Sequence, residues 1–177
     1  ARLHPFDNVC EKRVYLTPQF WDAEERAALA AAIARHDTDE FRFVDVGANV
    51  GLYTLFAFTQ ARARGLKFRG IAIEADPEMV ARLAINIDAS GAAQSVSVAA
   101  CGVSDRVGRA QLAIARASRG QSRLAPRGDV EVPIRPLLDV VLEAGFDRID
   151  AMKVDIEGSE FEALAPYFAN PSAPQPR

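Results

Sequence analysis

Short apolar runs alternate with longer segments of helical period along most of this chain. The short runs are rich in β-branched and aromatic residues, as buried strands are, and the longer segments place apolar residues on one helical face. Strands are predicted at 41–45, 68–74, 95–100 and 149–155, and helices at 22–35, 52–64, 76–90, 136–144 and 159–168. Such an alternation predicts an α/β fold with a mostly parallel, doubly wound sheet.

Both ends of the chain depart from this alternation. Residues 1–18 have no clear period, and Val14–Leu16 fits either a short strand or a cover over a ligand crevice. Asp22 is a suitable N-cap for the first helix, with Glu25 in the capping-box position. The last eight residues contain three prolines and show no core character. We therefore expect a single domain made of an N-terminal extension with a helix (1–40), a cofactor-binding core (41–168) and a proline-rich tail (169–177).

The segment 105–129 interrupts the core with a stretch richer in Gly, Arg and Ser. Residues 110–114 and 130–134 predict an antiparallel ribbon, and residues 118–128 predict a mobile loop within it. An insertion of this kind often shapes a substrate opening. A plain surface excursion explains the pattern equally well.

Composition mainly excludes classes of function. The 177 residues are 49% hydrophobic and 25% charged, which fits one globular domain with a sizeable core. A net charge of −3 gives no support for nucleic-acid binding. The sequence has no apolar run of membrane length and no signal-peptide pattern, so no membrane is expected. Cys10 and Cys101 lack C-x-x-C spacing, so no zinc site or disulfide framework is indicated and a reducing cytoplasm is expected.

The first predicted strand ends at Asp45 and is followed by Gly47, Gly51 and a helix. Glycines let a ligand approach the backbone, and ligands of open α/β sheets bind at the carboxyl ends of the strands. The dinucleotide fingerprint G-x-G-x-x-G would need glycines at Asn49 and Leu52 and therefore does not match. A carboxylate at this turn suits S-adenosylmethionine, which carries an ammonium, a sulfonium and ribose hydroxyls but no phosphate. The alternative is that Asp45 only caps the turn and the glycines serve packing.

Three predicted strands end in an acid, namely Asp45, Glu74 and Asp155. The carboxyl ends of parallel strands face the same way, so these side chains should converge on one crevice. Glu74 lies about one β-α-β unit after Asp45, where an acid is expected to hold ribose hydroxyls; the alternative is a solvated carboxylate. Tyr53, in the first turn of the following helix, either touches the ligand or packs in the core.

The fourth predicted strand runs into Asp155 and Glu157, with Gly158 permitting a tight turn. Two nearby acids suit the positioning of a substrate, a general base for a hydroxyl group, or a divalent cation. No third ligand is evident, so metal dependence stays open and no metal-ligating residues are assigned. Glu157 is also suited simply to complementing the helix dipole. Lys153, inside an apolar strand, is expected to form a structural ion pair.

Three motifs together resemble the FkbM-type methyltransferases: Phe43–Gly51 (FVDVGANVG), Ile73–Pro77 (IEADP) and Lys153–Glu160 (KVDIEGSE). The resemblance covers roughly residues 42–164. It implies a Rossmann-like class I methyltransferase fold and S-adenosylmethionine as cofactor, usually for methylation of a hydroxyl oxygen on a small molecule or sugar. That fold normally continues with a fifth strand, a helix and a β-hairpin, so a fold truncated at its C-terminus is expected here.

The resemblance also implies roles for single residues. Asp45, Gly47, Asn49 and Gly51 would form the methionine-side loop, Glu74 would hold the ribose, and Ala100 with Cys101 would lie near the adenine. The expected cofactor-binding residues are Asp45, Gly47, Ala48, Asn49, Gly51, Tyr53, Glu74, Ala75, Ala100 and Cys101, and the expected catalytic residues are Asp155 and Glu157. Two alternatives stay open: a nicotinamide-dependent oxidoreductase on a similar sheet, and a non-catalytic cofactor-binding or interaction module.

Overall fold

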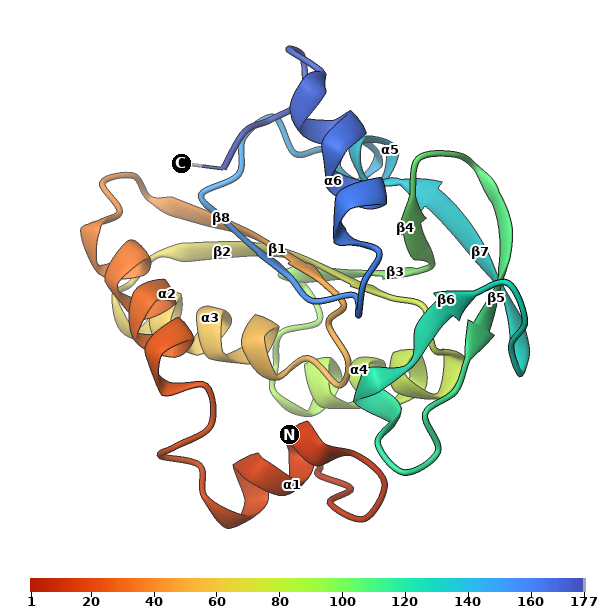
Figure 1. The fold of residues 1–177 in the computed structure, drawn as a ribbon. Helices are drawn as coiled ribbons and strands as arrows, with labels where there is room; N and C mark the ends of the chain where they lie inside the picture. Colours follow the sequence, from red (N-terminus) through yellow and green to blue (C-terminus); the bar gives the residue numbers. More distant parts are fainter. Residues whose placement is uncertain (177) are drawn as a thin grey trace.

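The computed structural model of the chain describes residues 1–176. Its main sheet has four parallel strands in the order β3-β2-β1-β8 (Figure 1). These strands are β1 (Glu40–Val46), β2 (Lys67–Glu74), β3 (Val96–Ala100) and β8 (Ala151–Val154). All four overlap the predicted strands, and their parallel pairing confirms the predicted α/β sheet.

Helices cover both faces of this sheet (Figure 1). One face carries α2 (Ala23–Arg35), α3 (Leu52–Ala63) and α4 (Pro77–Ala89), and the other carries α5 (Leu137–Glu143) and α6 (Glu160–Ala169). The side chains of β1 alternate between the two layers: Phe41 and Phe43 pack on the first, and Val44 and Val46 pack on the second. The sheet is therefore doubly wound, as predicted.

A second, mixed sheet follows β3 in the order β4-β7-β5-β6. It consists of β4 (Gly102–Ser104), β5 (Gly108–Ala113), β6 (Arg123–Ala125) and β7 (Val130–Pro136). The antiparallel pairing of β5 with β7 confirms the predicted ribbon. The segment predicted as a loop contains β6 and a 3-10 turn, η1 (Arg119–Gln121), so part of it is regular structure.

The N-terminal segment forms a helix, α1 (Val9–Leu16), so the strand considered for Val14–Leu16 is wrong. Asn8 caps this helix by accepting hydrogen bonds from the N–H groups of Cys10 (3.0 Å) and Glu11 (3.4 Å). The cap of Asn8 thus contributes to forming a helix in a segment that has no hydrophobic period.

Asp22 occupies the N-cap position of α2, as predicted, but the side-chain cap expected of it is absent. Asp22 precedes α2 with a left-handed backbone (φ 40°) and makes no side-chain cap. Its carboxylate instead accepts a hydrogen bond from the hydroxyl of Tyr53 at 3.0 Å. The Asp22 side chain therefore bonds to α3 and does not cap α2.

The C-terminal tail takes part in the core, contrary to its predicted lack of core character. Ala173 is buried beside α6, and the Tyr167 hydroxyl donates to the carbonyl oxygen of Pro174. Pro176 also forms a parallel bridge with Ile149. Prolines cannot donate backbone hydrogen bonds, but their carbonyl groups still accept them.

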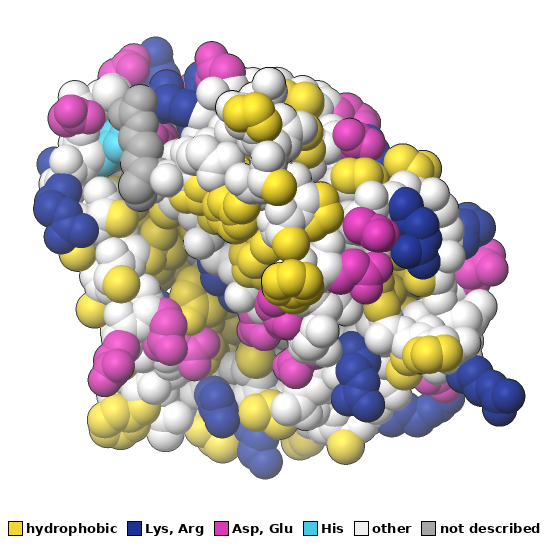
Figure 2. Space-filling model, turned by 45° about the horizontal axis from the view of Figure 1, so that its top comes forward, with side chains coloured by type: hydrophobic (Ala, Val, Ile, Leu, Met, Phe, Trp, Pro, Cys, Tyr) yellow, Lys and Arg dark blue, Asp and Glu magenta, His cyan; other side chains and the backbone are white. Residues whose placement is uncertain are grey.

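Among the described strands, β8 pairs only with β1, which leaves its other edge open. A hollow of about 550 Å³ lies along this edge, between β8 and α2. Figure 2 shows the hollow left of centre, with hydrophobic side chains on its walls. Within residues 1–176, no helix has the length and apolar character needed to cross a membrane.

Candidate functional site

A cavity of about 290 Å³ lies at the carboxyl ends of β1, β2 and β8. This volume is close to the lower end of the range typical of small-molecule sites, about 300–1,000 Å³. The walls come from segments that are far apart in the sequence. They include α1, the turn after β1, the end of β2, residues 101–103, and the turns at 118–124 and 155–159. The carboxyl ends of the parallel strands therefore form one crevice, as the sequence predicts.

The turn after β1 is held tightly between β2 and β8. Gly47 has φ +74°, and a Cβ atom at this position would overlap the carbonyl oxygen of Asp155. The N–H groups of Gly47 and Ala48 both donate to the Ile73 carbonyl oxygen, at 3.0 and 2.9 Å. The Lys153 ammonium donates to the Gly47 carbonyl oxygen at 2.9 Å. Only glycine fits this position, and the backbone of the turn is fixed on both sides.

Glu74, at the end of β2, presents a fixed carboxylate to the cavity. Its Oε2 accepts the N–H of Asn49 at 2.8 Å, and its Oε1 accepts the N–H of Asp76 at 2.8 Å. Burial raises the pKa of this carboxyl above its ordinary value, against the effect of the two N–H donors. Each oxygen keeps a lone pair, so the group can still accept hydrogen bonds from a vicinal diol.

Asp45 lies beneath the cavity and does not line it. Its side chain is fully buried, and its Oδ2 accepts from the N–H and the hydroxyl of Thr54, at 3.1 and 2.6 Å. Among the described residues its Oδ1 has no hydrogen-bond partner, and the Lys153 ammonium lies 3.8 Å from it. Burial raises the pKa of this carboxyl. Asp45 shares a face of β1 with Phe41 and Phe43, and its carboxylate holds the first turn of α3 through Thr54.

Asp155 and Glu157 follow β8 and line the cavity from exposed positions. Asp155 Oδ2 lies 3.5 Å from the Lys153 ammonium, so the predicted ion pair of Lys153 is present. The Glu160 carboxylate accepts from the N–H groups of Ile156 (3.3 Å) and Gly158 (3.2 Å). Backbone hydrogen bonds lower the pKa of Glu160. Glu160 therefore fixes the turn that carries the two cavity acids.

The structure brings most of the predicted site residues together. Those that line the cavity are Gly47, Ala48, Asn49, Tyr53, Glu74, Ala75, Cys101, Asp155 and Glu157. Asp45, Gly51 and Ala100 do not line it. Gly51 begins α3 with φ +85°, where a Cβ atom would lie 2.6 Å from Leu83, and Ala100 ends β3 in an exposed position. These residues support the site from behind or lie beside it.

Two cavity walls were not identified residue by residue from the sequence. α1 contributes Val9, Cys10 and Arg13, and the segment around η1 contributes residues 118–124. The sequence offered a cover at Val14–Leu16 and an opening near the insertion, but it has no period or motif that identifies the contacting residues. In the described part of the chain, no group of three His, Cys, Asp or Glu side chains is arranged to hold a metal ion.

Comparison with known proteins identifies the family. The model of the FkbM methyltransferase domain matches residues 45–173. The chain belongs to this family. Methyltransferase sdnD of Sordaria araneosa is 29% identical over 157 residues, which cover 68% of this chain and 58% of that protein. The chain thus spans little more than half the length of this curated relative.

Among solved structures, methyltransferase FkbM from Methylobacillus flagellatus KT aligns with 93% of this chain and 41% of its own length. The TM-score is 0.52 and the sequence identity is 20%. This likeness supports the fold, which is that of the FkbM methyltransferases. It agrees with the parallel sheet and the two helical layers described above.

Proposed function

We propose that this chain is an S-adenosylmethionine-dependent methyltransferase that methylates a hydroxyl oxygen of a small molecule or sugar. The observation that carries the proposal is the Glu74 carboxylate, fixed by two backbone N–H groups at the wall of a cavity that Asp155 also lines. Both acids lie inside the segment that matches the FkbM methyltransferase domain.

The residues of the cavity fit a cationic, phosphate-free nucleoside. The open lone pairs of Glu74 suit the ribose diol, and the Asp155 carboxylate favours a positive charge nearby. A pyrophosphate at the turn after β1 would lie beside the Asp155 carboxylate, and Asn49 and Leu52 stand where the dinucleotide fingerprint needs glycines. This argues against the nicotinamide-dependent alternative. When bound, S-adenosylmethionine supplies a methyl group activated by its sulfonium.

We assign the binding roles by position along the cavity. Gly47, Asn49 and Tyr53 would contact the methionine side, and Glu74 would hold the ribose. Ala75 and Cys101, at the ends of β2 and β3, would border the adenine. Their small, largely apolar side chains leave room for a flat ring.

Asp155 is the residue we assign to the acceptor. Its carboxylate is 60% exposed, so an incoming hydroxyl group can reach it, and the Lys153 ammonium lies 3.5 Å away. Asp155 would accept the hydroxyl hydrogen bond, orient the oxygen and take its proton as the new oxygen–carbon bond forms. Orientation of this kind supplies up to about 7–11 kcal/mol of the barrier reduction. Glu157, on the same turn, would border the acceptor.

The proposal is tested with methyl-labelled S-adenosylmethionine and a panel of small hydroxyl compounds and sugars. Each acceptor is paired with its O-methylated derivative, in which the reacting oxygen is blocked. Mass spectrometry showing label on the free hydroxyl oxygen, and none on the blocked partner, supports O-methylation. Label transferred to nitrogen or carbon overturns the hydroxyl assignment, and failure to bind either S-adenosylmethionine or S-adenosylhomocysteine overturns the methyltransferase proposal.

A further inference from the structure

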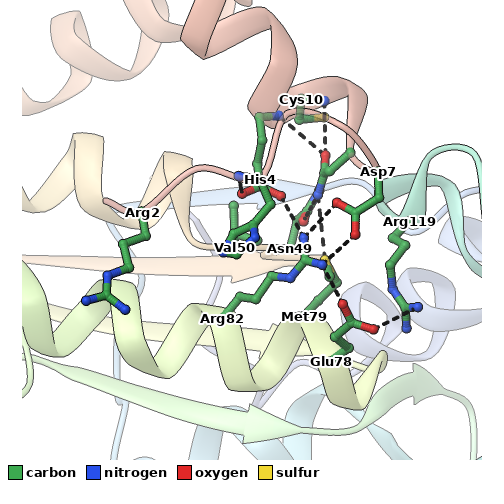
Figure 3. Close-up of polar contacts among 12 residues, drawn as sticks. Arg2, His4, Asp7, Cys10, Asn49, Val50, Glu78, Met79, Arg82 and Arg119 are labelled. Atoms are coloured by element: carbon green, nitrogen blue, oxygen red, sulfur yellow. Dashed lines mark hydrogen bonds and ion pairs between the residues drawn. The ribbon is translucent and has the colours of Figure 1, made fainter.

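The N-terminal segment lies against the turn that carries Asn49, although it falls outside residues 45–173 that match the family. Asn8 is 2% exposed and sits where α1 begins. Figure 3 shows this region: Asn49 and Val50 of the turn lie close to the segment that carries His4, Asp7 and Cys10. A buried asparagine needs hydrogen-bond partners for both its amide oxygen and its amide nitrogen.

The hydrogen bonds of Asn8 fix the orientation of its amide. Its Oδ1 accepts the N–H groups of Cys10 and Glu11 at the start of α1. Its Nδ2 therefore points the other way and donates to Oδ1 of Asn49 at 2.7 Å. One side chain thus caps a helix and holds the cofactor turn, through different atoms.

Asn49 passes this constraint to Glu74. Asn49 has φ +52°, a left-handed conformation that few residues with a side chain adopt and that asparagine adopts more readily than most. In that conformation its N–H donates to Glu74 Oε2 at 2.8 Å. A change in the backbone of Asn49 would redirect this donor and release one oxygen of the carboxylate.

The segment around η1 closes on the same pair of amides. A Cβ atom at Gly120 would lie 2.5 Å from Nδ2 of Asn49 and 3.4 Å from Oδ1 of Asn8. The N–H of Arg119 also donates to the carbonyl oxygen of Asp7 at 2.9 Å. Asn49 is therefore enclosed by the N-terminal segment on one side and the segment around η1 on the other.

Ion pairs fasten these segments to α4. Arg82 of α4 pairs with Asp7 at 2.5 Å, with the fully buried Glu11 at 3.3 Å, and with Glu78. Arg119 pairs with Glu78 at 2.9 Å and with the helix-capping Asp76 at 2.8 Å. Figure 3 shows Arg82, Glu78 and Arg119 joined in this way beside Asp7. These ion pairs hold the N-terminal segment in the position where Asn8 contacts Asn49.

We propose that Asn8 is a positioning residue for the ribose of the cofactor. It holds Asn49 in its left-handed conformation, and Asn49 in turn holds the Glu74 carboxylate in the orientation that accepts the diol. The N-terminal segment is then part of the cofactor site and not only a cover over it. This inference rests on the proposed function, because it takes S-adenosylmethionine as the ligand.

The variant that tests the inference is Asn8→Asp. An aspartate still accepts the Cys10 and Glu11 N–H groups, so the cap of α1 is kept, but it has no N–H to donate to Asn49. Asn170→Asp is the matched control, because Asn170 also accepts a backbone N–H, from Ser172 at 2.9 Å, and lies in the tail. Thermal unfolding of both variants checks that each one folds.

The readout is calorimetric affinity for S-adenosylhomocysteine and for its 2′-deoxyribose analogue. We expect Asn8→Asp to weaken binding of S-adenosylhomocysteine about tenfold and to leave the 2′-deoxy analogue nearly unchanged. Glu74→Gln should also reduce the preference for S-adenosylhomocysteine over its 2′-deoxy analogue. The double variant should lose no more affinity for S-adenosylhomocysteine than Glu74→Gln alone. Asn170→Asp should bind both compounds as the unmodified chain does.

Three results would overturn the inference: unchanged binding by Asn8→Asp, an equal loss for both compounds, or additive losses in the double variant. An equal loss would show that Asn8 acts only through general stability. If the unmodified chain binds neither compound, the proposed function fails, and the inference falls with it. That outcome is distinct, because it appears before any variant is compared.

Discussion

The Lys153 ammonium donates a hydrogen bond to the carbonyl oxygen of Gly47, joining the end of β8 to the turn after β1 at 2.9 Å. The same ammonium lies 3.8 Å from Asp45 Oδ1 and 3.5 Å from Asp155 Oδ2. One cation therefore balances a buried acid beneath the cavity and an exposed acid at its rim. The arrangement links the stability of the turn to the charge of the site.

Replacing Lys153 with Met should destabilise the protein, and more so at higher pH. Burial holds the folded pKa of Asp45 above its ordinary value, so ionisation of Asp45 costs stability as the pH rises through that folded pKa. Lys153 offsets this cost only when Asp45 is ionised. Urea unfolding from pH 4 to pH 8 should show a loss that grows to about 3 kcal/mol at the alkaline end.

Lys67→Met is the control for this prediction. Lys67 pairs with Asp39 on the surface, where its side chain is 75% exposed. Its loss should stay within about 0.5 kcal/mol at every pH. A Lys153→Met deficit that does not change with pH would show that the ammonium does not act through Asp45.

Gly47→Ala and Gly65→Ala form a matched pair, because both glycines have φ +74°. A Cβ atom at Gly65 has no neighbour within 4 Å, whereas one at Gly47 would overlap the Asp155 carbonyl oxygen. Gly65→Ala should cost about 1–2 kcal/mol of unfolding free energy for its backbone conformation alone. Gly47→Ala should cost about 1–3 kcal/mol more. Equal losses in denaturant titrations would contradict the close approach of β8 to the turn.

Glu74→Gln should lower the affinity for S-adenosylhomocysteine about 10- to 100-fold, the loss expected for hydrogen bonds to a charged group. Its effect should depend on pH. Burial raises the pKa of Glu74, so acid converts the accepting carboxylate into its neutral form at a higher pH than for an exposed glutamate. Affinity of the unmodified chain should therefore fall as the pH is lowered, while Glu74→Gln stays flat.

The prediction is checked by measuring the affinity for S-adenosylhomocysteine by calorimetry at a series of decreasing pH values. Glu143→Gln, at the exposed end of α5, is the control. The control should follow the unmodified chain throughout. If the Glu74→Gln titration tracks the unmodified chain instead, the ribose assignment is wrong.

Asp155→Asn should lower turnover about 10²- to 10⁴-fold, the range for general acid–base groups. The affinity for S-adenosylhomocysteine should stay near that of the unmodified chain, because the amide keeps the size of the side chain. Rates measured with a hydroxyl acceptor, beside the exposed control Asp88→Asn, separate the two effects. Unchanged turnover would remove Asp155 from the reaction.

The sequence predicts the parts of the fold that depend on local pattern. The four parallel strands follow from their apolar runs, and their parallel order places Glu74 and Asp155 on one cavity. The ion pair of Lys153 follows from the cost of burying a charge in an apolar strand. These inferences need only short-range signals and the geometry of a parallel sheet.

The position of Asp45 was predicted less well, although the signal was present. Phe41, Phe43 and Asp45 are spaced two residues apart along β1, so their side chains must point to the same face of the strand. Phe41 and Phe43 are buried on that face, against α2 and α3. The position of Asp45 at the strand end alone predicts that the acid faces the cavity. The side-chain period of the strand decides the question.

The N-terminal wall of the cavity could not be located from local pattern. α1 depends on the cap of Asn8 and on the contact of Glu11 with Arg82, which is distant in sequence. The burial of Ala173 in the tail likewise depends on contacts with α6, and the tail has no hydrophobic period from which they could be predicted. Tertiary contacts between polar or isolated residues leave no periodic trace in the sequence.

The most direct test compares the binding of S-adenosylhomocysteine and NAD to the unmodified chain by isothermal calorimetry. A cavity that favours a phosphate-free nucleoside should bind one S-adenosylhomocysteine per chain and show no heat with NAD at the same concentrations. Binding of NAD without binding of S-adenosylhomocysteine would contradict the assignment of the cavity to S-adenosylmethionine and, with it, the proposed methyltransferase activity.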